Sequence, residues 1–309
     1  MPWRVTTLVT LTDASIPVVH LPQLRGLQPD SDAIATLGEA LSSLGFVAVV
    51  DHGVDAALLQ RAYATAADTF ALPAATKQGY ERPEEGRQRG YTSMGIEHAK
   101  DRDTPDLKEF WQVGRSGPGL PDNVFATEVE GFEATMLALF HALDSVAAAL
   151  LGGIERYLQL PVGFFEDFTR GGNSVMRIIH YPPLRGDVPE GAVRAAAHED
   201  INLLTVLPVS TQPGLQLMTR AGEWVDVQTP PDVMVCDTGD MMQLLTGGRL
   251  RSTTHRVVNP TEGADRSRYS MPFFCHPRPD AELSPARDGA PAILAHDFMM
   301  ERLRAIGVA

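Results

Sequence analysis

Short β-type runs separated by turn residues fill the chain from Ser174 onward and restrict its fold more than any other feature. The runs are rich in Val, Ile, Leu and aromatic residues, and Gly, Pro, Asn or Asp stand between them. Strands are expected over 175–181, 201–207, 215–218, 224–227, 233–235, 241–245, 252–258 and 269–274. A series of about eight short strands with turns at this spacing is typical of a double-sheet, barrel-like β fold of the jelly-roll type.

The part of the chain before Ser174 carries helical patterns as well as strands. Helices are expected over 31–44, 55–70 and 123–158, with another at 296–306, and strands over 16–21 and 46–50. The polar region 76–115 is expected to form loops with short elements, and Gly152-Gly153 to break or kink the longest helix. The fold class is therefore α+β, mainly β, with a double-stranded β-helix (jelly-roll) core flanked by helices.

Three regions are expected to form one compact unit. They are an N-terminal helix and strand region (1–122), a long packing helix (123–170) and the jelly-roll core with its C-terminal helix (171–309).

The net charge of the chain limits the kinds of partner that it is expected to bind. There are 26 Lys and Arg against 39 Asp and Glu, a formal net charge of −13 at pH 7. Nucleic-acid backbones and anionic membranes bind basic surfaces, so neither is expected as a partner. No segment is expected to reach the roughly 18 to 20 apolar residues that span a bilayer, and a cytoplasmic location is expected. Two cysteines, Cys236 and Cys275, are too few for a disulfide framework or a four-cysteine zinc site.

A metal site is indicated by two histidines and a carboxylate. His198 and Asp200 stand two positions apart, and His255 lies in a later β-type run. Alternate side chains of a strand point to the same face, so a strand end can present an imidazole and a carboxylate together. Such a set covers one face of an octahedral Fe(II) ion and leaves three positions open for a co-substrate and O2. The H-x-D pattern alone is weak and favours a surface turn.

A carboxylate site is indicated by Arg268 and Ser270, which also stand two positions apart and so face the same way on a strand. The guanidinium fork binds two oxygens, and the hydroxyl adds a third donor. Taken alone, Arg268 is better interpreted as a solvated arginine at the start of a strand.

Together and in this order, these residues resemble the Fe(II)- and 2-oxoglutarate-dependent dioxygenase family, in the group that includes isopenicillin N synthase and plant flavonoid and hormone oxygenases. The resemblance covers nearly the whole chain, through 16–19, 45–54, 70–77, 177–183, 214–217, 224–227, 238–241 and 252–257. It implies a jelly-roll enzyme in which His198, Asp200 and His255 bind Fe(II). It further implies that Arg268, Ser270 and Tyr181 bind the far carboxylate of 2-oxoglutarate.

The resemblance also implies the reaction. A small organic molecule would be hydroxylated, desaturated or cyclised with O2, and succinate and CO2 would be released, in secondary metabolism or small-molecule catabolism. The substrate pocket is expected to include Arg89, Tyr91, Met176 and His276, with Arg89 as a candidate partner for an acidic group. Asp237 departs from the family, which often has Asn at that place. The sequence leaves the substrate and the oligomeric state open.

Two other interpretations are compatible with the same residues. An Fe(II) oxidase like isopenicillin N synthase would use Tyr181 and Arg268-x-Ser270 to bind the carboxylate of its substrate and would consume no 2-oxoglutarate. A non-catalytic jelly-roll binding protein would keep the fold without chemistry. The intact set of His198, Asp200 and His255 argues against it, because a binding protein needs no metal ligands with open positions.

Overall fold

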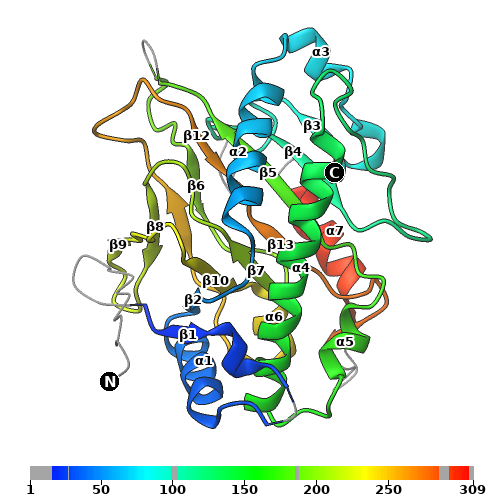
Figure 1. The fold of residues 1–309 in the computed structure, drawn as a ribbon, viewed down its shortest axis with the longest axis vertical. Helices are drawn as coiled ribbons and strands as arrows, with labels where there is room; N and C mark the ends of the chain where they lie inside the picture. Colours follow the sequence, from blue (N-terminus) through cyan, green and yellow to red (C-terminus); the bar gives the residue numbers. More distant parts are fainter. Residues whose placement is uncertain (1–15, 27, 99–103, 185–187, 285–291, 306–309) are drawn as a thin grey trace.

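Two β-sheets form the centre of the computed structural model, which describes residues 16–26, 28–98, 104–184, 188–284 and 292–305 (Figure 1). The larger sheet comprises β1 (Val18–His20), β2 (Phe46–Val50), β3 (Gly90–Thr92), β4 (Glu109–Gly114), β5 (Val175–Tyr181), β7 (Leu204–Leu207), β10 (Met234–Thr238), β12 (Arg268–Ser270) and β13 (Phe273–Cys275). The smaller sheet comprises β6 (Ala195–His198), β8 (Leu215–Met218), β9 (Trp224–Asp226) and β11 (His255–Val257). This two-sheet architecture is the predicted jelly roll.

The strand order brings distant segments together. In the larger sheet it is β1-β2-β10-β7-β13-β5-β4-β3, and β12 pairs with the C-terminal half of β5. In the smaller sheet it is β6-β11-β8-β9. The central strand β5 therefore contacts β4 on one side and both β12 and β13 on the other. A short hairpin of β14 (Glu282–Ser284) and β15 (Ile293–Leu294) lies apart from both sheets.

Helices cover the outer face of the larger sheet (Figure 1). They are α1 (Ser31–Ser43), α2 (Ala56–Phe70), α3 (Ala74–Gln78), α4 (Phe132–Tyr157) and α5 (Phe164–Thr169), with the 3-10 turns η1 (Leu21–Leu24) and η2 (Pro83–Glu85). Asp30 caps α1 by accepting hydrogen bonds from the backbone amides of Asp32 at 2.8 Å and Ala33 at 3.2 Å. Two further helices, α6 (Asp240–Leu245) and α7 (Ala295–Ala305), belong to the C-terminal half.

The longest helix differs from its prediction in two respects. It begins at Phe132 rather than at residue 123, because Gly131 has φ of 72°, a left-handed conformation that no helix continues. The glycine pair does not break it, since α4 runs on to Tyr157. A Cβ at Gly153 would lie 2.7 Å from Cδ2 of Leu37, so this glycine allows α1 to approach α4 closely.

Helix α4 is long and apolar enough to cross a membrane, contrary to the expectation that no segment of the chain reaches that limit. Half of its most apolar 18-residue window is buried inside the protein. There α4 contacts α1 and α2 as well as the strands β4, β7 and β13. Its apolar residues are therefore accounted for by the core, as in a packing helix.

Two local predictions were wrong. Residues 241–245 form α6 instead of a strand, and the neighbouring side chains Met241 and Met242 are both buried, which does not fit strand alternation. The polar region 76–115 contains β4, whose six residues are all buried and pair with β5 along its length. The division of the chain at residues 122 and 170 stays a prediction.

Candidate functional site

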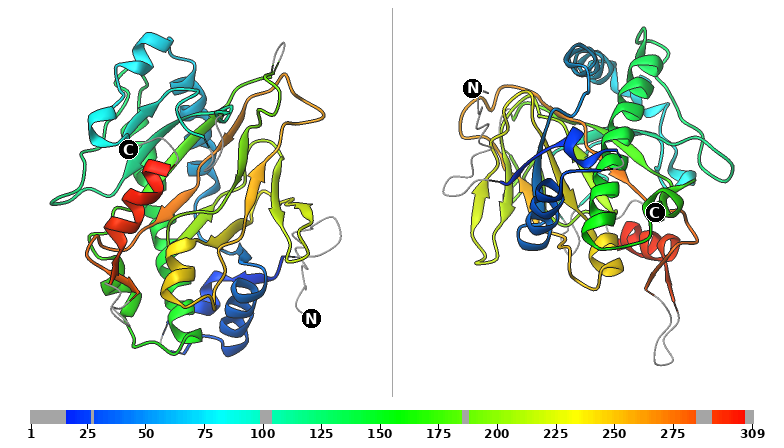
Figure 2. Two further views of the ribbon diagram at one scale, coloured as in Figure 1. Left: turned by 180° about the vertical axis from the view of Figure 1, so that it is seen from behind. Right: turned by 60° about the horizontal axis from the view of Figure 1, so that its bottom comes forward.

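A cavity of about 580 Å³ is lined by strands of both sheets and includes all six predicted ligands of iron and 2-oxoglutarate in its wall. The strands β5, β6, β11 and β12 contribute to the wall, and so do the loops that precede β3 and β4. Helix α7 closes one side with Met299, Arg302 and Leu303. It is drawn in red in Figure 2, where the left view shows it in front of the strands.

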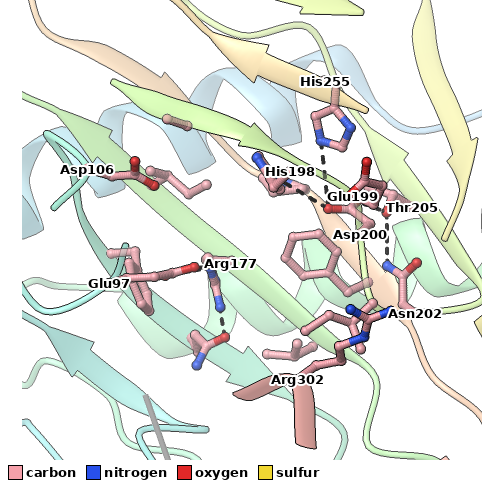
Figure 3. A pocket seen from close by; sticks show the side chains of 18 of the residues that line it. Glu97, Asp106, Arg177, His198, Glu199, Asp200, Asn202, Thr205, His255 and Arg302 are labelled. Carbon is pink, nitrogen blue, oxygen red and sulfur yellow. Dashed lines mark hydrogen bonds and ion pairs between the residues drawn. The ribbon is translucent and has the colours of Figure 1, made fainter. Parts of the chain in front are cut away.

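The predicted metal ligands converge in this cavity (Figure 3). His198 ends β6 and pairs across the smaller sheet with His255, the first residue of β11. Asp200 lies in the loop after β6, with Oδ1 3.9 Å from Nε2 of His198 and 3.7 Å from Nε2 of His255. One ligand atom from each residue lies within 4.8 Å of the others. Within the described ranges, no second group of three His, Cys, Asp or Glu side chains is arranged in this way.

The hydrogen bonds of the two histidines prepare them for a metal. Nδ1 of His198 lies 2.7 Å from the carbonyl oxygen of Ala196, and Nδ1 of His255 lies 3.1 Å from that of Thr253. A carbonyl oxygen only accepts, so each Nδ1 carries the proton and each Nε2 keeps its lone pair for a metal ion.

The carboxylate of Asp200 is oriented in the same way. Thr205 donates its hydroxyl to Oδ2 of Asp200, and Asn202 donates to the Thr205 hydroxyl at 2.9 Å. Oδ1 is left facing the two imidazoles. Burial and the nearby imidazole of His255 lower the pKa of His198, so its neutral form is favoured. This donor set of two neutral imidazoles and one carboxylate fits Fe(II) with open positions.

Asp237 of β10 lies in the same cavity wall. Burial and the charge of Asp200 raise the pKa of the Asp237 carboxyl well above its usual range. A protonated carboxyl group has nearly the shape of a carboxamide and shares its ability to donate and accept hydrogen bonds. The structure thus gives a physical reason why Asp can stand where the family often has Asn.

The predicted ligands of 2-oxoglutarate lie together in another part of the cavity wall. Arg268 pairs with Tyr181, and Ser270 with Ile179, between the strands β12 and β5. The Arg268 guanidinium lies over the Tyr181 ring, 4.9 Å from its centroid. Its Nε donates to the carbonyl of Gln212 at 3.0 Å, and Nη2 to the hydroxyl of Ser210 at 2.9 Å.

The Arg268 guanidinium has no protein carboxylate to balance its charge among the described residues. It is only 2% exposed, and its buried Nη1 has no hydrogen-bond partner in the part of the chain that the structure describes. Burial lowers the pKa of Arg268, which measures the cost of holding this cation without a counter-ion. An unpaired donor on a buried cation, beside the Ser270 hydroxyl, fits the far carboxylate of 2-oxoglutarate.

A charged part of the cavity wall was missed by the sequence interpretation. Arg177 of β5 donates through Nη1 to both oxygens of Glu97, at 3.0 and 2.9 Å, and Lys108 lies 2.8 Å from Asp106. Oδ1 of Asp106 also accepts from the backbone amide of Ala196, on the strand that carries His198. The available signal was Arg177 itself, a charged residue on the same strand face as Val175 and Ile179.

The four predicted substrate residues separate into two pairs. Arg89 and His276 lie in the cavity wall. The Arg89 side chain is fully buried and donates to the carbonyl of Arg115 and to Asn173, and burial lowers the pKa of His276 to about 4. Tyr91 and Met176 are not among the lining residues.

Tyr91 and Met176 were assigned to the wrong side of the larger sheet. Tyr91 donates its hydroxyl to Glu109, and Met176 is fully buried in the core beneath the helices. Met176 has the opposite strand parity from Val175 and Arg177, so it cannot share their face.

Two family models match the chain. Residues 16–130 match the N-terminal region of the non-haem dioxygenases in morphine synthesis, and residues 172–277 match the 2OG-Fe(II) oxygenase superfamily. The second range contains the whole predicted ligand set.

Individual relatives agree with the family models. The proline hydroxylase buaE of Petromyces alliaceus is 30% identical over 79% of this chain and 81% of its own length. The 2-oxoglutarate-dependent dioxygenase citB of Monascus ruber is 30% identical over 93% of this chain and 94% of its own length.

Solved structures are similar over nearly the whole chain. A 2OG-Fe(II) oxygenase family protein from Caulobacter crescentus has a TM-score of 0.79 at 34% identity, covering 94% of this chain and 98% of its own. T7H of Neurospora crassa, solved in complex with alpha-KG (2-oxoglutarate), has a TM-score of 0.83 at 25% identity, covering 97% of this chain and 99% of its own. The chain therefore belongs to the 2OG-Fe(II) oxygenase superfamily and is a 2-oxoglutarate-dependent dioxygenase, an oxidoreductase that uses Fe(II) and O2.

Proposed function

We propose that His198, Asp200 and His255 hold the iron of this enzyme, and that it hydroxylates a small organic molecule. Arg268 and Ser270, with Tyr181 beside them, bind the far carboxylate of 2-oxoglutarate. The observation that carries the proposal is that three convergent ligand atoms line the same cavity as a buried guanidinium whose Nη1 has no partner among the described residues.

The bound iron, with 2-oxoglutarate and O2, supplies an oxidant strong enough for an unactivated C–H bond and leaves succinate and CO2. The protein residues orient these groups. The backbone carbonyls of Ala196 and Thr253 fix the imidazoles, and Thr205 fixes the Asp200 carboxylate. Leu215 and Val257 in the cavity wall keep water from the reacting centre.

A small-molecule substrate suits the size of the cavity. The names of two similar proteins concern small molecules, since buaE is called a proline hydroxylase and T7H was solved in complex with thymine. We place the reaction of this chain in the cytoplasm and in secondary metabolism or small-molecule catabolism.

Uncoupled turnover tests the proposal. Protein reconstituted with Fe(II) without oxygen is given 2-oxoglutarate and O2, and succinate is followed by mass. We expect succinate from the wild type and from His20→Ala, which replaces an exposed histidine outside the cavity, but not from His198→Ala or Arg268→Ala. Stoichiometric iron without any change of its spectrum on adding 2-oxoglutarate would favour the oxidase instead. Failure to bind iron would refute the assignment of the metal ligands.

A further inference from the structure

One ion pair in the cavity wall has no part in holding iron or 2-oxoglutarate. Arg177 projects from β5, and Glu97 comes from the segment between β3 and β4, 80 positions earlier in the chain (Figure 3). Both side chains line the cavity, with exposed fractions of 15% and 11%. Since a buried ion pair adds little net stability, its place in the wall calls for a role in binding.

The pair presents a donor next to an acceptor. Arg177 donates through Nη1 to Glu97 and through Nε to Oε1 of Gln112 at 3.2 Å. Its second terminal nitrogen, Nη2, has no hydrogen-bond partner in the described part of the chain. The carboxylate of Glu97 has lone pairs in excess of the donors that it meets. We call Nη2 of Arg177 with the Glu97 carboxylate the donor–acceptor edge.

The surroundings favour a flat group at this edge. The Arg177 guanidinium lies on the ring of Phe110, 4.2 Å from its centroid, and 5.6 Å from that of Phe274. Phe110 and Phe274 both line the cavity. A planar ligand can therefore lie in the plane of the guanidinium or stack against the half-buried ring of Phe274.

The charges at the edge favour a neutral ligand. Burial by itself would raise the pKa of Glu97, but Arg177 and Lys108 outweigh it and bring that pKa down to about 2, so Glu97 is ionised. Glu97 then neutralises Arg177, while Asp106 neutralises Lys108 at 2.8 Å. A carboxylate placed on Nη2 would meet the charge of Glu97 in a poorly solvated cavity, where repulsion between like charges is strong.

We propose that Arg177 and Glu97 are the specificity-determining residues of this oxygenase, and that they recognise a neutral, planar amide or imide group of the substrate. The substrate carbonyl accepts from Nη2 of Arg177, and the substrate N–H donates to Glu97. This inference rests on the proposed function, because it takes the cavity as the place of the reaction.

Substrate analogues can test the edge by binding alone. The Fe(II)–2-oxoglutarate complex is formed without oxygen, and the change of its absorption band is titrated with uracil, with 1,3-dimethyluracil, which lacks the N–H donor, and with benzoate. We expect uracil to perturb the band at a concentration at least tenfold lower than either of the others. Arg177→Met should lose the response to uracil while the band itself still forms.

A charge change should reverse the preference. In Glu97→Gln the Arg177 cation is no longer neutralised, so benzoate should gain at least tenfold relative to uracil. Arg302→Met is the matched control. It also removes a cation from the cavity wall, but this cation pairs with Asp240 and not with Glu97, so the ranking of uracil and benzoate should stay unchanged.

The possible failures can be told apart. If the band forms but 1,3-dimethyluracil or benzoate binds as well as uracil in the wild type, the proposed edge is wrong and the proposed function stands. If the ranking is the same in Glu97→Gln as in the wild type, the role of Glu97 is wrong. If wild-type protein forms no band with Fe(II) and 2-oxoglutarate, the proposed function fails, and this inference fails with it.

Discussion

The central strand β5 carries buried polar residues on both faces, and the two sets are built differently. On the face toward the helices, His180 contacts Glu109 at 2.8 Å and Ser267 at 2.9 Å, and Glu109 also accepts from Lys77 at 2.7 Å and from Tyr91. Within the described residues, each charged group of this helix-face network meets another member of it.

On the cavity face, the corresponding groups are left incomplete. Nη1 of Arg268 is buried without a partner among the described residues, and Nη2 of Arg177 makes no hydrogen bond to them. Burying a donor without a partner costs about 1 to 3 kcal/mol, which a ligand that accepts from it can recover. In this protein, therefore, the polar network on the helix face is complete in itself, whereas the groups on the cavity face leave donors for a ligand.

The largest effect is expected on the cavity side, from loss of a metal ligand. Asp200→Ala should reduce succinate formation more than ~10³-fold, because the iron site contributes several kcal/mol to the reaction. The iron content and turnover of the purified variant are to be measured against the wild type. Near-normal turnover would show that Asp200 is not a ligand.

On the helix side, loss of a partner should affect stability and not binding. Glu109→Ala leaves the buried Lys77 cation without its carboxylate and should lower the free energy of unfolding by about 3 to 5 kcal/mol. Urea denaturation measures that loss, and titration at low temperature should show unchanged 2-oxoglutarate binding by the folded fraction. If Glu109→Ala instead bound 2-oxoglutarate more weakly and kept its full stability, the helix face would serve binding, contrary to the comparison.

Removal of Arg268 should affect ligand binding and not stability, the opposite of what is expected for Glu109→Ala. Arg268→Met should weaken 2-oxoglutarate binding about 10- to 100-fold, matching about 1.5 to 3 kcal/mol for hydrogen bonds to a charged group. Because an unpaired buried cation disappears, the ligand-free variant should melt no lower than the wild type. Binding is read from the Fe(II)–2-oxoglutarate band, and unchanged affinity would remove Arg268 from the site.

The smallest effect should come from His276. Burial lowers its pKa to about 4, below the value near 6.5 of an unfolded histidine. The stability that depends on its neutral form is therefore complete above about pH 6.5 and is lost as the pH falls toward 4. Between pH 7.5 and pH 5.5, the free energy of unfolding should fall by about 1 kcal/mol less in His276→Asn than in the wild type. Urea denaturation at both pH values measures this fall in each protein. An equal fall in the variant and in the wild type would contradict the lowered pKa of His276.

The sequence predicted some elements very well. The range 175–181 became β5 without change, 46–50 became β2, and the β-rich half gave the expected two sheets. The strands were predicted correctly because they follow from local periodicity, which does not depend on distant segments. The six residues that the family resemblance implies as ligands of iron and 2-oxoglutarate lie in one cavity, and their roles stay a prediction.

Other features left no clear local signal. The strand β4 lies in a polar region, and its six residues are buried because it pairs with β3 and β5 inside the sheet and α4 packs against it. Both faces of β5 are apolar along most of their length, so alternation alone did not show whether Met176 or Arg177 faces the cavity. Tyr91 was placed in the substrate pocket with its neighbour Arg89, because the sequence did not show that Tyr91 of β3 faces the helix side of the sheet.

The sequence by itself determined the family, through motifs that resemble it in its own order, and the jelly roll, through short β-type runs separated by turn residues. The ligands of iron and 2-oxoglutarate, which the resemblance implies, stay a prediction. The tertiary structure alone decided which face of β5 forms the cavity, that burial raises the pKa of Asp237, and that Glu97 pairs with Arg177. The physical reason is that burial and charge pairing depend on contacts between segments far apart in the chain. Such contacts exist only once the sheets and helices have packed.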